Sequence, residues 1–310
     1  MTDMKTLSGE PASSLSFGTM QFGSNADEIA SAEMFEACRE AGVNSFDTAY
    51  VYNSGRSEEI YGALARNSAE ELLTATKVAQ DLPSTAEVIR KSLDVSRQRL
   101  GMDQVDILYL HRYDDETPLE ESIEALVALQ SEGLIRYIGV SNFAAWQTVN
   151  ANNIAKALGS RIDVAQPMYN LVKRQAEVEI LPACFDQDIA VFNYSPLGGG
   201  LLTGKYARGE TGRLDDVDMY AKRYAPNWMR DAARRLLAIS DKLDVASATL
   251  AVAWSGYHPA VTSPIISARS AEQLQPSLDA LSFDMSADLY DEISALTPRP
   301  SPATDRLEEL

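Results

Sequence analysis

Residues 46–52 read FDTAYVY and come directly after a short apolar run that begins at Val43. Two later segments repeat this arrangement, since residues 72–77 read LLTATK and residues 105–111 read VDILYLH. In each segment a polar side chain stands where a β-strand would end. Chemistry in barrels and open α/β sheets gathers at the carboxyl ends of parallel strands. These segments therefore predict a parallel α/β fold with a polar site at that edge.

Short runs with strand propensity alternate with amphipathic stretches along nearly the whole chain. The runs expected to form strands are residues 15–20, 43–46, 72–76, 105–110, 136–140, 163–166, 189–193 and 261–266. The stretches expected to form helices are residues 27–41, 57–66, 84–100, 119–131, 144–158 and 175–185, with a further helix beginning near Asn227. This alternation predicts a closed (β/α)8 TIM barrel.

Residues 197–226 form the longest interruption of this pattern, between the seventh strand and the helix near Asn227. The segment is rich in glycine, tyrosine and charged residues, so we expect a loop without regular structure over the barrel mouth. We also expect an extra C-terminal helix. With 310 residues, 45% of them hydrophobic, residues 1–310 are predicted to form a single barrel domain.

The chain is acidic, with 27 Lys and Arg against 45 Asp and Glu and a net charge of −18. This balance argues against binding to nucleic acid or to an anionic membrane. An anionic cofactor would need a local basic site. No leader of charged and then apolar residues opens the chain, and no apolar stretch approaches the roughly 20 residues that span a bilayer. We therefore expect a soluble, cytoplasmic protein.

The small number of cysteines and histidines limits the chemistry. Cys38 and Cys184 lie in apolar helical patterns, which favours buried thiols in a reducing compartment over a disulfide. The two histidines are His111 and His258, too few for a His-rich zinc or iron site, so we expect no metal. His258 precedes Pro259 and is expected to end a helix.

Four side chains near strand ends, Asp47, Tyr52, Lys77 and His111, suit proton donation by a tyrosine. A phenol titrates near pH ~10, so it gives up a proton at neutral pH only if the phenolate is stabilised. Lys77 would lower the pKa of Tyr52, and Asp47 would keep Lys77 charged and oriented. His111 would hydrogen-bond a substrate oxygen. The four groups together predict carbonyl reduction, with hydride supplied by another group.

Two other barrel chemistries fit these residues less well. A Schiff-base aldolase would use Lys77 but would give no role to Asp47 and Tyr52. A glycosidase needs two carboxylates that flank the sugar. Beyond Asp47 the nearest acids, Asp114 and Asp115, are expected to lie on a solvated rim.

Residues 46–49 with Tyr52, followed by residues 57–59 and Leu64, resemble the aldo-keto reductase signature around the catalytic tyrosine. Further motifs follow in the family's order: LHR at 110–112, GVSNF at 139–143, QPMYN at 166–170, YSPL at 194–197, GKY at 204–206 and ARS at 268–270. The resemblance extends over nearly everything from residue 15 to residue 296. It implies an NADP(H)-dependent reductase of aldehydes or ketones, in which the four residues above are catalytic.

The resemblance also implies a set of cofactor-binding residues. In the family an aromatic ring packs on the nicotinamide, and Ser, Asn and Gln side chains bind its carboxamide. These roles fall to Tyr194, Ser141, Asn142 and Gln166, and the remaining expected contacts are Ser195, Leu197, Gly199, Lys205, Arg269 and Gln273. Residues 197–226 would fold across the dinucleotide, and the guanidinium of Arg269 would bind the 2′-phosphate. Plainer readings remain open, because Ser141 and Asn142 could cap the next helix and Arg269 could be solvated.

The sequence departs from the family at the adenine end. Ser267 stands where a glycine is usual, and Pro276 with Ser277 replaces an expected Glu-Asn pair. The retained arginine favours NADP(H) over NAD(H). Two alternatives remain open, namely a cofactor-binding regulatory subunit with little turnover and an NAD-dependent sugar or alcohol dehydrogenase.

The expected partner is a small-molecule carbonyl substrate held at an aromatic mouth. The side chains expected there are Met20, Phe22, Tyr113, Tyr220 and Tyr224. Small aldehydes, sugar-derived carbonyls and pyridoxal-like rings fit such a mouth about equally. The sequence does not indicate an oligomeric state.

Overall fold

The structure is a computed structural model that describes residues 3–309. Its eight parallel strands follow the order β7-β6-β5-β4-β3-β2-β1-β8. They are β1 (Ser16–Gly18), β2 (Ser45–Asp47), β3 (Leu73–Val78), β4 (Val105–Leu110), β5 (Ile135–Ser141), β6 (Val164–Gln166), β7 (Ala190–Val191) and β8 (Ile265–Ile266). The curled sheet is bridged between Tyr194 and Ile265, and the Ile265 amide donates to the Asn193 carbonyl at 2.8 Å. The predicted (β/α)8 barrel is confirmed.

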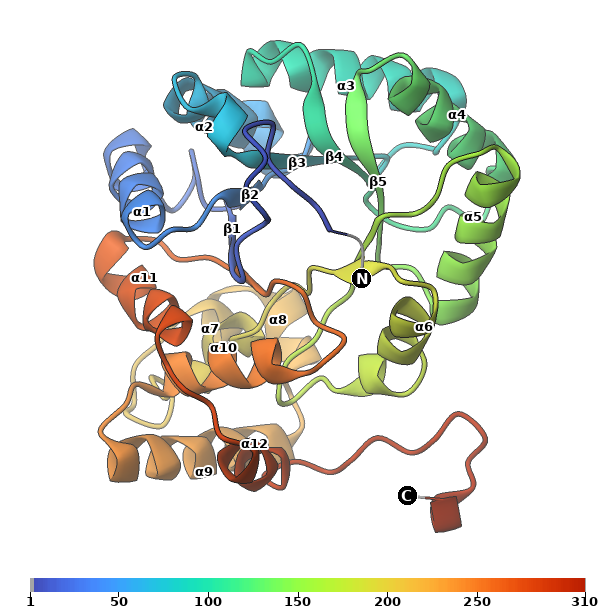
Figure 1. Cartoon of the computed structure of the whole chain (residues 1–310). Coiled ribbons are helices and arrows are strands. Elements are labelled where there is room, and N and C mark those ends of the chain that lie inside the picture. The colour runs from blue at the N-terminus through green and yellow to red at the C-terminus, as the bar shows by residue number, and fades with distance from the viewer. Residues whose placement is uncertain (1–2, 310) are drawn as a thin grey trace.

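Helices form a ring around the strands, and Figure 1 shows them following the chain from α1 to α6 around the sheet. They are α1 (Glu28–Glu40), α2 (Arg56–Ala65), α3 (Ala86–Leu100), α4 (Leu119–Ser131), α5 (Ala145–Ala157), α6 (Ile180–Asp186), α10 (Ser247–Tyr257) and α11 (Ala271–Leu278). Outside this ring lie α9 (Asn227–Leu243) and the expected C-terminal helix α12 (Ala287–Ser294), both next to α10 (Figure 1). Side-chain caps fix several helix starts, for example Asp27, which accepts from the Ala30 amide at 2.9 Å.

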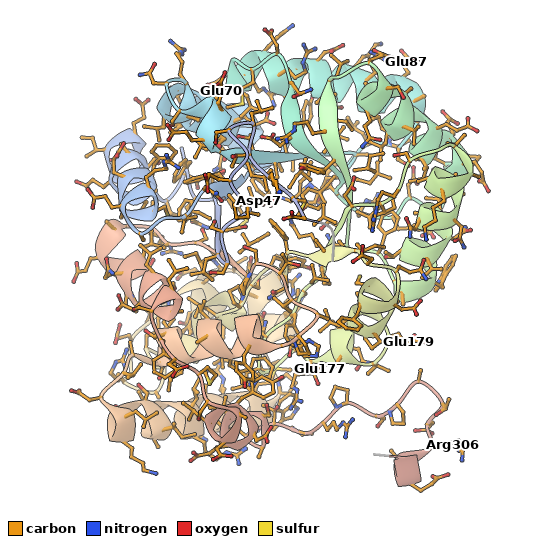
Figure 2. The ribbon with its side chains drawn as sticks, viewed as in Figure 1. Asp47, Glu70, Glu87, Glu177, Glu179 and Arg306 are labelled. Carbon is orange, nitrogen blue, oxygen red and sulfur yellow. The ribbon has the colours of Figure 1, made fainter. Side chains whose placement is uncertain are left out.

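The alternation of side chains along the strands fills the barrel and aims the polar groups at its mouth. Leu73, Ala75, Ile107 and Tyr109 belong to a buried cluster inside the barrel. Because successive side chains alternate between the two faces of a sheet, Lys77 continues the inward series of Leu73 and Ala75. His111 continues the series of Ile107 and Tyr109 in the same way. Figure 2 shows Asp47 toward the middle of the ring, whereas Glu70 and Glu87 stand at its rim.

The structure corrects the expectation that residues 197–226 lack regular structure. The segment contains a helical turn at Gly198–Thr203 and two short helices, α7 (Arg213–Asp216) and α8 (Asp218–Arg223). Gly199 and Gly200 have φ values of 66° and 94°, so the first turn reverses direction through a left-handed conformation that glycine tolerates. No strand pairs with this segment, so its backbone groups need other partners. Hydrogen bonds within the segment supply them and form the short helices.

Several predicted elements were too long, among them the strands expected at 15–20 and 189–193, which the structure limits to Ser16–Gly18 and Ala190–Val191. The expected strand 261–266 pairs only at Ile265–Ile266, because Pro264 has no amide hydrogen to donate to the ladder. The expected helix 175–185 is divided into a turn at Gln175–Glu177 and α6.

The cysteine prediction is confirmed, since Cys38 and Cys184 are buried free thiols. His258 directly follows the last residue of α10, as expected. Among residues 3–309, none of the helices combines the length and apolar character that a bilayer crossing requires. A single domain over residues 1–310 stays a prediction.

Candidate active site

The structure brings Asp47, Tyr52 and Lys77 into direct contact. The Lys77 ammonium donates to an Asp47 carboxylate oxygen, to the Thr48 carbonyl at 2.7 Å and to the Tyr52 hydroxyl at 3.3 Å. The ring of His111 stands edge-on to the ring of Tyr52, with 5.8 Å between centroids. These residues come from β2, from the turn after it, from β3 and from the end of β4. The four expected catalytic side chains therefore form one cluster.

Lys77 is fully buried and carries its charge inside the barrel. Burial opposes that charge, but the Asp47 carboxylate and the Tyr52 hydroxyl outweigh it and raise the pKa of Lys77 above its usual value. The second carboxylate oxygen of Asp47 accepts from the Gln166 amide at 2.8 Å. The ammonium and the carboxylate are thus both held in place by hydrogen bonds on several sides.

Burial raises the pKa of Tyr52, while the adjacent Lys77 charge and its hydrogen bond lower it and the Asp47 charge raises it. Lys77 therefore lowers the pKa of Tyr52, as expected. Burial outweighs this effect, so the pKa of Tyr52 lies above its ordinary value. Tyr52 consequently keeps its proton at neutral pH, and Lys77 stands ready to compensate the anion if the proton leaves.

Burial and the Lys77 charge lower the pKa of His111 to about 2, so its imidazole is neutral across the physiological range. Its Nδ1 atom is buried without a hydrogen-bond partner in the described part of the chain. A neutral imidazole carries one donor and one acceptor. The ring can therefore donate a hydrogen bond to a carbonyl oxygen without adding a positive charge.

A tight turn after Tyr52 fixes the position of the phenol. Asn53, Ser54 and Gly55 all have positive φ, at 50°, 55° and 94°. The Asn53 amide donates to the Met20 and Phe22 carbonyls at 2.9 and 2.7 Å, which ties this turn to the loop after β1. A side chain at Gly55 would collide with the guanidinium of Arg99, so only glycine fits.

Behind this turn lies a buried ion pair that the sequence analysis did not identify. Arg99 on α3 donates to the Tyr50 carbonyl at 2.9 Å and to the Glu58 carboxylate at 3.1 Å. Glu58 is fully buried and also accepts from the Thr76 hydroxyl at 2.6 Å. The only sequence signal for this ion pair was the acidic Glu58 on the apolar face of a helix. This pair fixes the backbone between Asp47 and Tyr52.

The side chains expected at the nicotinamide form a second hydrogen-bonded layer. The Tyr194 hydroxyl donates to the Asn142 side chain at 2.7 Å, and Asn142 donates to the His111 carbonyl at 2.9 Å. The Ser141 hydroxyl donates to the Gln166 carbonyl at 3.1 Å. Helix α5 is preceded by Ala144, so neither Ser141 nor Asn142 caps it. The capping alternative is therefore excluded.

Two neighbouring cavities contain the remaining expected residues. The inner cavity, of about 630 Å³, is lined by Asp47, Tyr52, His111, Ser141, Asn142, Gln166, Tyr194, Ser195, Leu197 and Gly199. The outer cavity, of about 710 Å³, is lined by Leu197, Lys205, Arg269 and Gln273. Of the expected site residues, Lys77 alone lines neither cavity, because it lies buried beneath Tyr52. Leu197, Gly200, Arg213 and Ser267 line both cavities.

The outer cavity contains both cations and acids, namely Lys205, Arg208, Arg213 and Arg269 with Glu210, Asp241, Asp244 and Glu272. Burial lowers the pKa of Lys205, and the nearby charges of Arg269 and Arg213 lower it further. The Arg269 amide donates to the Gln273 side chain at 2.9 Å, at the start of α11. Arg213 was not among the residues expected at the site. Its only sequence signal was a positive charge within residues 197–226, and the short helix α7 places it between the cavities.

The expected aromatic mouth is partly wrong. Met20 and Tyr220 line the inner cavity, but Phe22 and Tyr224 are fully buried in the hydrophobic core. Phe22 packs against Phe17, with 5.7 Å between ring centroids. Tyr113 lines neither cavity and packs on Phe143 and Trp146 instead. The spacing of apolar residues in a sequence predicts which side chains are buried. It does not predict whether an aromatic residue of a loop lines a cavity or packs in the core.

Asp114 is less solvated than expected, because its carboxylate accepts from the Thr117 hydroxyl at 2.6 Å and from the Ser84 amide at 2.8 Å. These bonds lower the pKa of Asp114 to about 2. Asp114 therefore shapes the loop after β4 and does not line either cavity. Within residues 3–309 no group of three or more His, Cys, Asp or Glu side chains is placed to hold a metal ion.

Comparison with known proteins agrees with this geometry. The model of the aldo/keto reductase family matches residues 14–298. A rice (Oryza sativa subsp. japonica) protein named probable voltage-gated potassium channel subunit beta is 34% identical, over 97% of this chain and 93% of its own length. Uncharacterized oxidoreductase YrpG from Bacillus subtilis (strain 168) is 30% identical, over 96% and 95%. Human aldo-keto reductase family 7 member A3 is 31% identical, over 85% and 87%.

Proposed function

The chain belongs to the aldo/keto reductase family, and from this premise we propose that it reduces an aldehyde or ketone to the alcohol with NADPH. The observation that carries the proposal is the contact of the buried Lys77 ammonium with both the Asp47 carboxylate and the Tyr52 hydroxyl. Such a phenol can give up its proton because the resulting anion would lie beside a fixed positive charge.

In the proposed reaction the substrate oxygen lies between Tyr52 and His111. A bound reduced nicotinamide would supply a hydride to the carbonyl carbon. Tyr52 donates its proton to the oxygen, so the C=O bond becomes a C–OH group. Lys77 stabilises the tyrosinate until Tyr52 takes a proton from solvent, and neutral His111 orients the oxygen by a hydrogen bond. In the reverse direction Tyr52 accepts the alcohol proton.

The two cavities fit a dinucleotide that carries phosphates. Ser267 has a buried hydroxyl without a partner among residues 3–309, and it borders both cavities. A bound group there would satisfy this hydroxyl. The left-handed glycine turn leaves the backbone of Gly199 and Gly200 open to the cavities. These features support binding of the nicotinamide half in the inner cavity and the adenosine half in the outer cavity.

The neighbouring cations Lys205 and Arg269 of the outer cavity favour NADP(H) over NAD(H). Lys205 and Arg269 are close enough for the arginine to lower the lysine's pKa, and a phosphate would relieve that repulsion. We propose that Arg269 binds the 2′-phosphate and that residues 197–226 cover the dinucleotide. We also propose that residues 1–310 form a single domain and that the protein is cytoplasmic.

A second candidate function rests on the names of two relatives. The rice relative and an Arabidopsis thaliana relative, each 34% identical, are both named probable voltage-gated potassium channel subunit beta. A cofactor-binding regulatory subunit with little turnover is therefore the main alternative, and an NAD-dependent sugar or alcohol dehydrogenase is the other. The complete Asp47, Tyr52, Lys77 and His111 cluster supports an enzyme over the subunit.

The test is a pair of titrations followed by a turnover assay. Purified protein is titrated with NADPH and with NADH, with quenching of tryptophan fluorescence as the signal. Steady-state oxidation of NADPH is then measured with a panel of small aldehydes. Tight NADPH binding with sustained turnover supports the proposal, while binding without turnover supports the regulatory subunit. A preference for NADH would favour the dehydrogenase, and the absence of binding would overturn all three.

A further inference from the structure

Three guanidinium groups line the inner cavity, although the chain as a whole carries a net charge of −18. They belong to Arg112, Arg213 and Arg223. None of the three forms an ion pair with a carboxylate in the described part of the chain, whereas arginines on the outer helices, such as Arg90 and Arg234, do. In an acidic protein, unpaired cations at a cavity indicate an anionic ligand.

The dinucleotide accounts for only one of these three groups. Arg213 borders both cavities, so it lies where the phosphates of the proposed cofactor would pass. Arg112 and Arg223 line the inner cavity and not the outer one. Since the inner cavity contains Tyr52 and His111, these two cations face the space left for the substrate.

Both groups are held in position by the protein. The Arg112 Nε donates to the Gln80 carbonyl at 2.6 Å, so its two terminal nitrogens remain free to bind. The half-buried Arg223 ends α8 and lies over the ring of Tyr220, with 5.3 Å from its guanidinium carbon to the ring centroid. Arg112 directly follows His111, and Arg223 belongs to the segment after β7, so they come from different sides of the ring (Figure 1).

Arg223 borders the same cavity as Tyr52, and Tyr194 and Tyr220 also line that cavity. Burial raises the pKa of Tyr194, and the nearby charge of Arg223 opposes that rise. Arg223 therefore lies beside two tyrosines of the cavity wall, on the side formed by the segment after β7.

The rest of the lining is neutral, polar in part and apolar in part, apart from two aspartates. The charge of Asp47 is compensated by Lys77, which leaves Asp81 as the other acidic side chain of the inner cavity against three arginines. Met20, Val51 and Met219 provide apolar surface between the charged groups. This combination fits a molecule with an apolar body, a carbonyl at one end and a negative charge at the other.

Resting on the function proposed above, we propose that the substrate is an aldehyde or ketone that carries an anionic group, a carboxylate or a phosphate. Arg223 binds this group through charge-assisted hydrogen bonds, and Arg112 supports it from the opposite side of the mouth. The carbonyl then lies at Tyr52 and His111. Arg223 is the specificity-determining residue of this pair, because it is less exposed than Arg112.

The test compares three para-substituted benzaldehydes with the same reacting group: 4-carboxybenzaldehyde, 4-formylphenyl phosphate and the neutral methyl 4-formylbenzoate. We expect kcat/KM with NADPH to be about 10–100-fold higher for at least one anion than for the ester. The better anion distinguishes a carboxylate from a phosphate. Arg223→Gln should lower kcat/KM for the anions toward that for the ester and so remove this preference, and Arg223→Lys should restore part of it.

The matched control is Lys222→Gln, which removes the same charge from the neighbouring, exposed position of α8 that lines neither cavity. It should keep the preference. Equal kcat/KM values for the anions and the ester, or an Arg223→Gln variant that slows all three alike, would overturn this inference alone. Lack of turnover of every aldehyde despite NADPH binding would overturn the proposed function and this inference with it.

Discussion

The inner and outer cavities touch along one wall but are built in different ways. Around the inner cavity, Asp47, Lys77 and Gln166 sit on strands and already satisfy one another through hydrogen bonds. Around the outer cavity, Lys205 and Arg269 sit on a loop and before a helix, where their charges repel each other. The Asp47, Lys77 and Gln166 cluster is thus preorganised before any ligand arrives, whereas the Lys205 and Arg269 pair would gain from a bound anion.

The largest expected effect is on the inner side. Tyr52→Phe should lower turnover by about 10²–10⁴-fold, because it removes the proton donor while leaving the ring. NADPH affinity, followed by fluorescence titration, should change little. Tyr113→Phe is the matched control, since Tyr113 lines neither cavity, and it should behave as wild type. Turnover of Tyr52→Phe at the wild-type rate would remove Tyr52 from the mechanism.

Preorganisation can be tested separately from chemistry. Lys77→Met leaves the buried Asp47 charge without its cation, so the free energy of unfolding should fall by about 3–5 kcal/mol. The double variant Asp47→Asn with Lys77→Met should recover most of that stability in urea titrations, because no buried charge remains. Both variants should lack turnover. If the double variant were no more stable than Lys77→Met, the loss would have to come from packing.

On the outer side, Arg269→Ala should weaken NADPH binding by about 10–100-fold, the usual range for a charge-assisted hydrogen bond. NADH has no 2′-phosphate, so its affinity should stay the same. Titration of both cofactors against wild type and against Arg66→Ala, an exposed arginine outside both cavities, gives the comparison. An equal loss for NADPH and NADH would mean that Arg269 supports the loop and does not bind the phosphate.

The neutral state of His111 makes a prediction about acid stability. The unfolded chain takes up a proton on this residue below pH ~6.5, whereas the native pKa is about 2, so the unfolded state binds more protons in that interval. Stability should therefore fall with acid by up to about 1.4 kcal/mol per pH unit from this residue. Denaturant titrations of His111→Gln between pH 7 and 4 should show a shallower fall. Parallel slopes for the two proteins would contradict the burial of a neutral imidazole.

The smallest expected effect concerns the wall between the cavities. Gly199→Ala puts a methyl group 2.8 Å from the ring of Tyr220, in a backbone with φ of 66°. Gly209→Ala has similar backbone strain, at φ of 82°, but no atom within 4 Å. Both should lose about 1 kcal/mol of stability, and only Gly199→Ala should weaken NADPH binding, by several-fold. Equal binding by the two variants would show that the loop yields without affecting the cofactor.

Sequence reasoning succeeded where the position of a strand end decides the outcome. Lys77 and His111 could be placed at the barrel mouth because each stands where a predicted strand ends, and the carboxyl ends of parallel strands meet at one edge. Sequence reasoning failed where contacts between distant residues determine the local conformation. The left-handed turn after Tyr52 is held by Asn53 on the Met20 and Phe22 carbonyls and packs at Gly55 against Arg99, and these contacts are distant in the sequence.

The loop after β7 shows the same limit. Its length and glycines indicated a covering segment, but the short helices α7 and α8 set the direction of Arg213 and Arg223. Helices this short have weak propensity signals, because their stability comes from the segments they pack on, here each other and the turn at Gly198–Thr203. Phe22 and Tyr224 were misplaced for a related reason, since the core competes with the cavity for loop aromatics.

The seam between β7 and β8 consists of two very short strands joined by the Tyr194–Ile265 bridge, and both of these residues line the inner cavity. In hydrogen-exchange terms, this seam is where the barrel would open at least cost, because few ladder bonds close it. A ligand in the inner cavity touches both sides of the seam. A bound cofactor would then hold β7 and β8 together, and the barrel would be most stable against opening in the cofactor-bound protein.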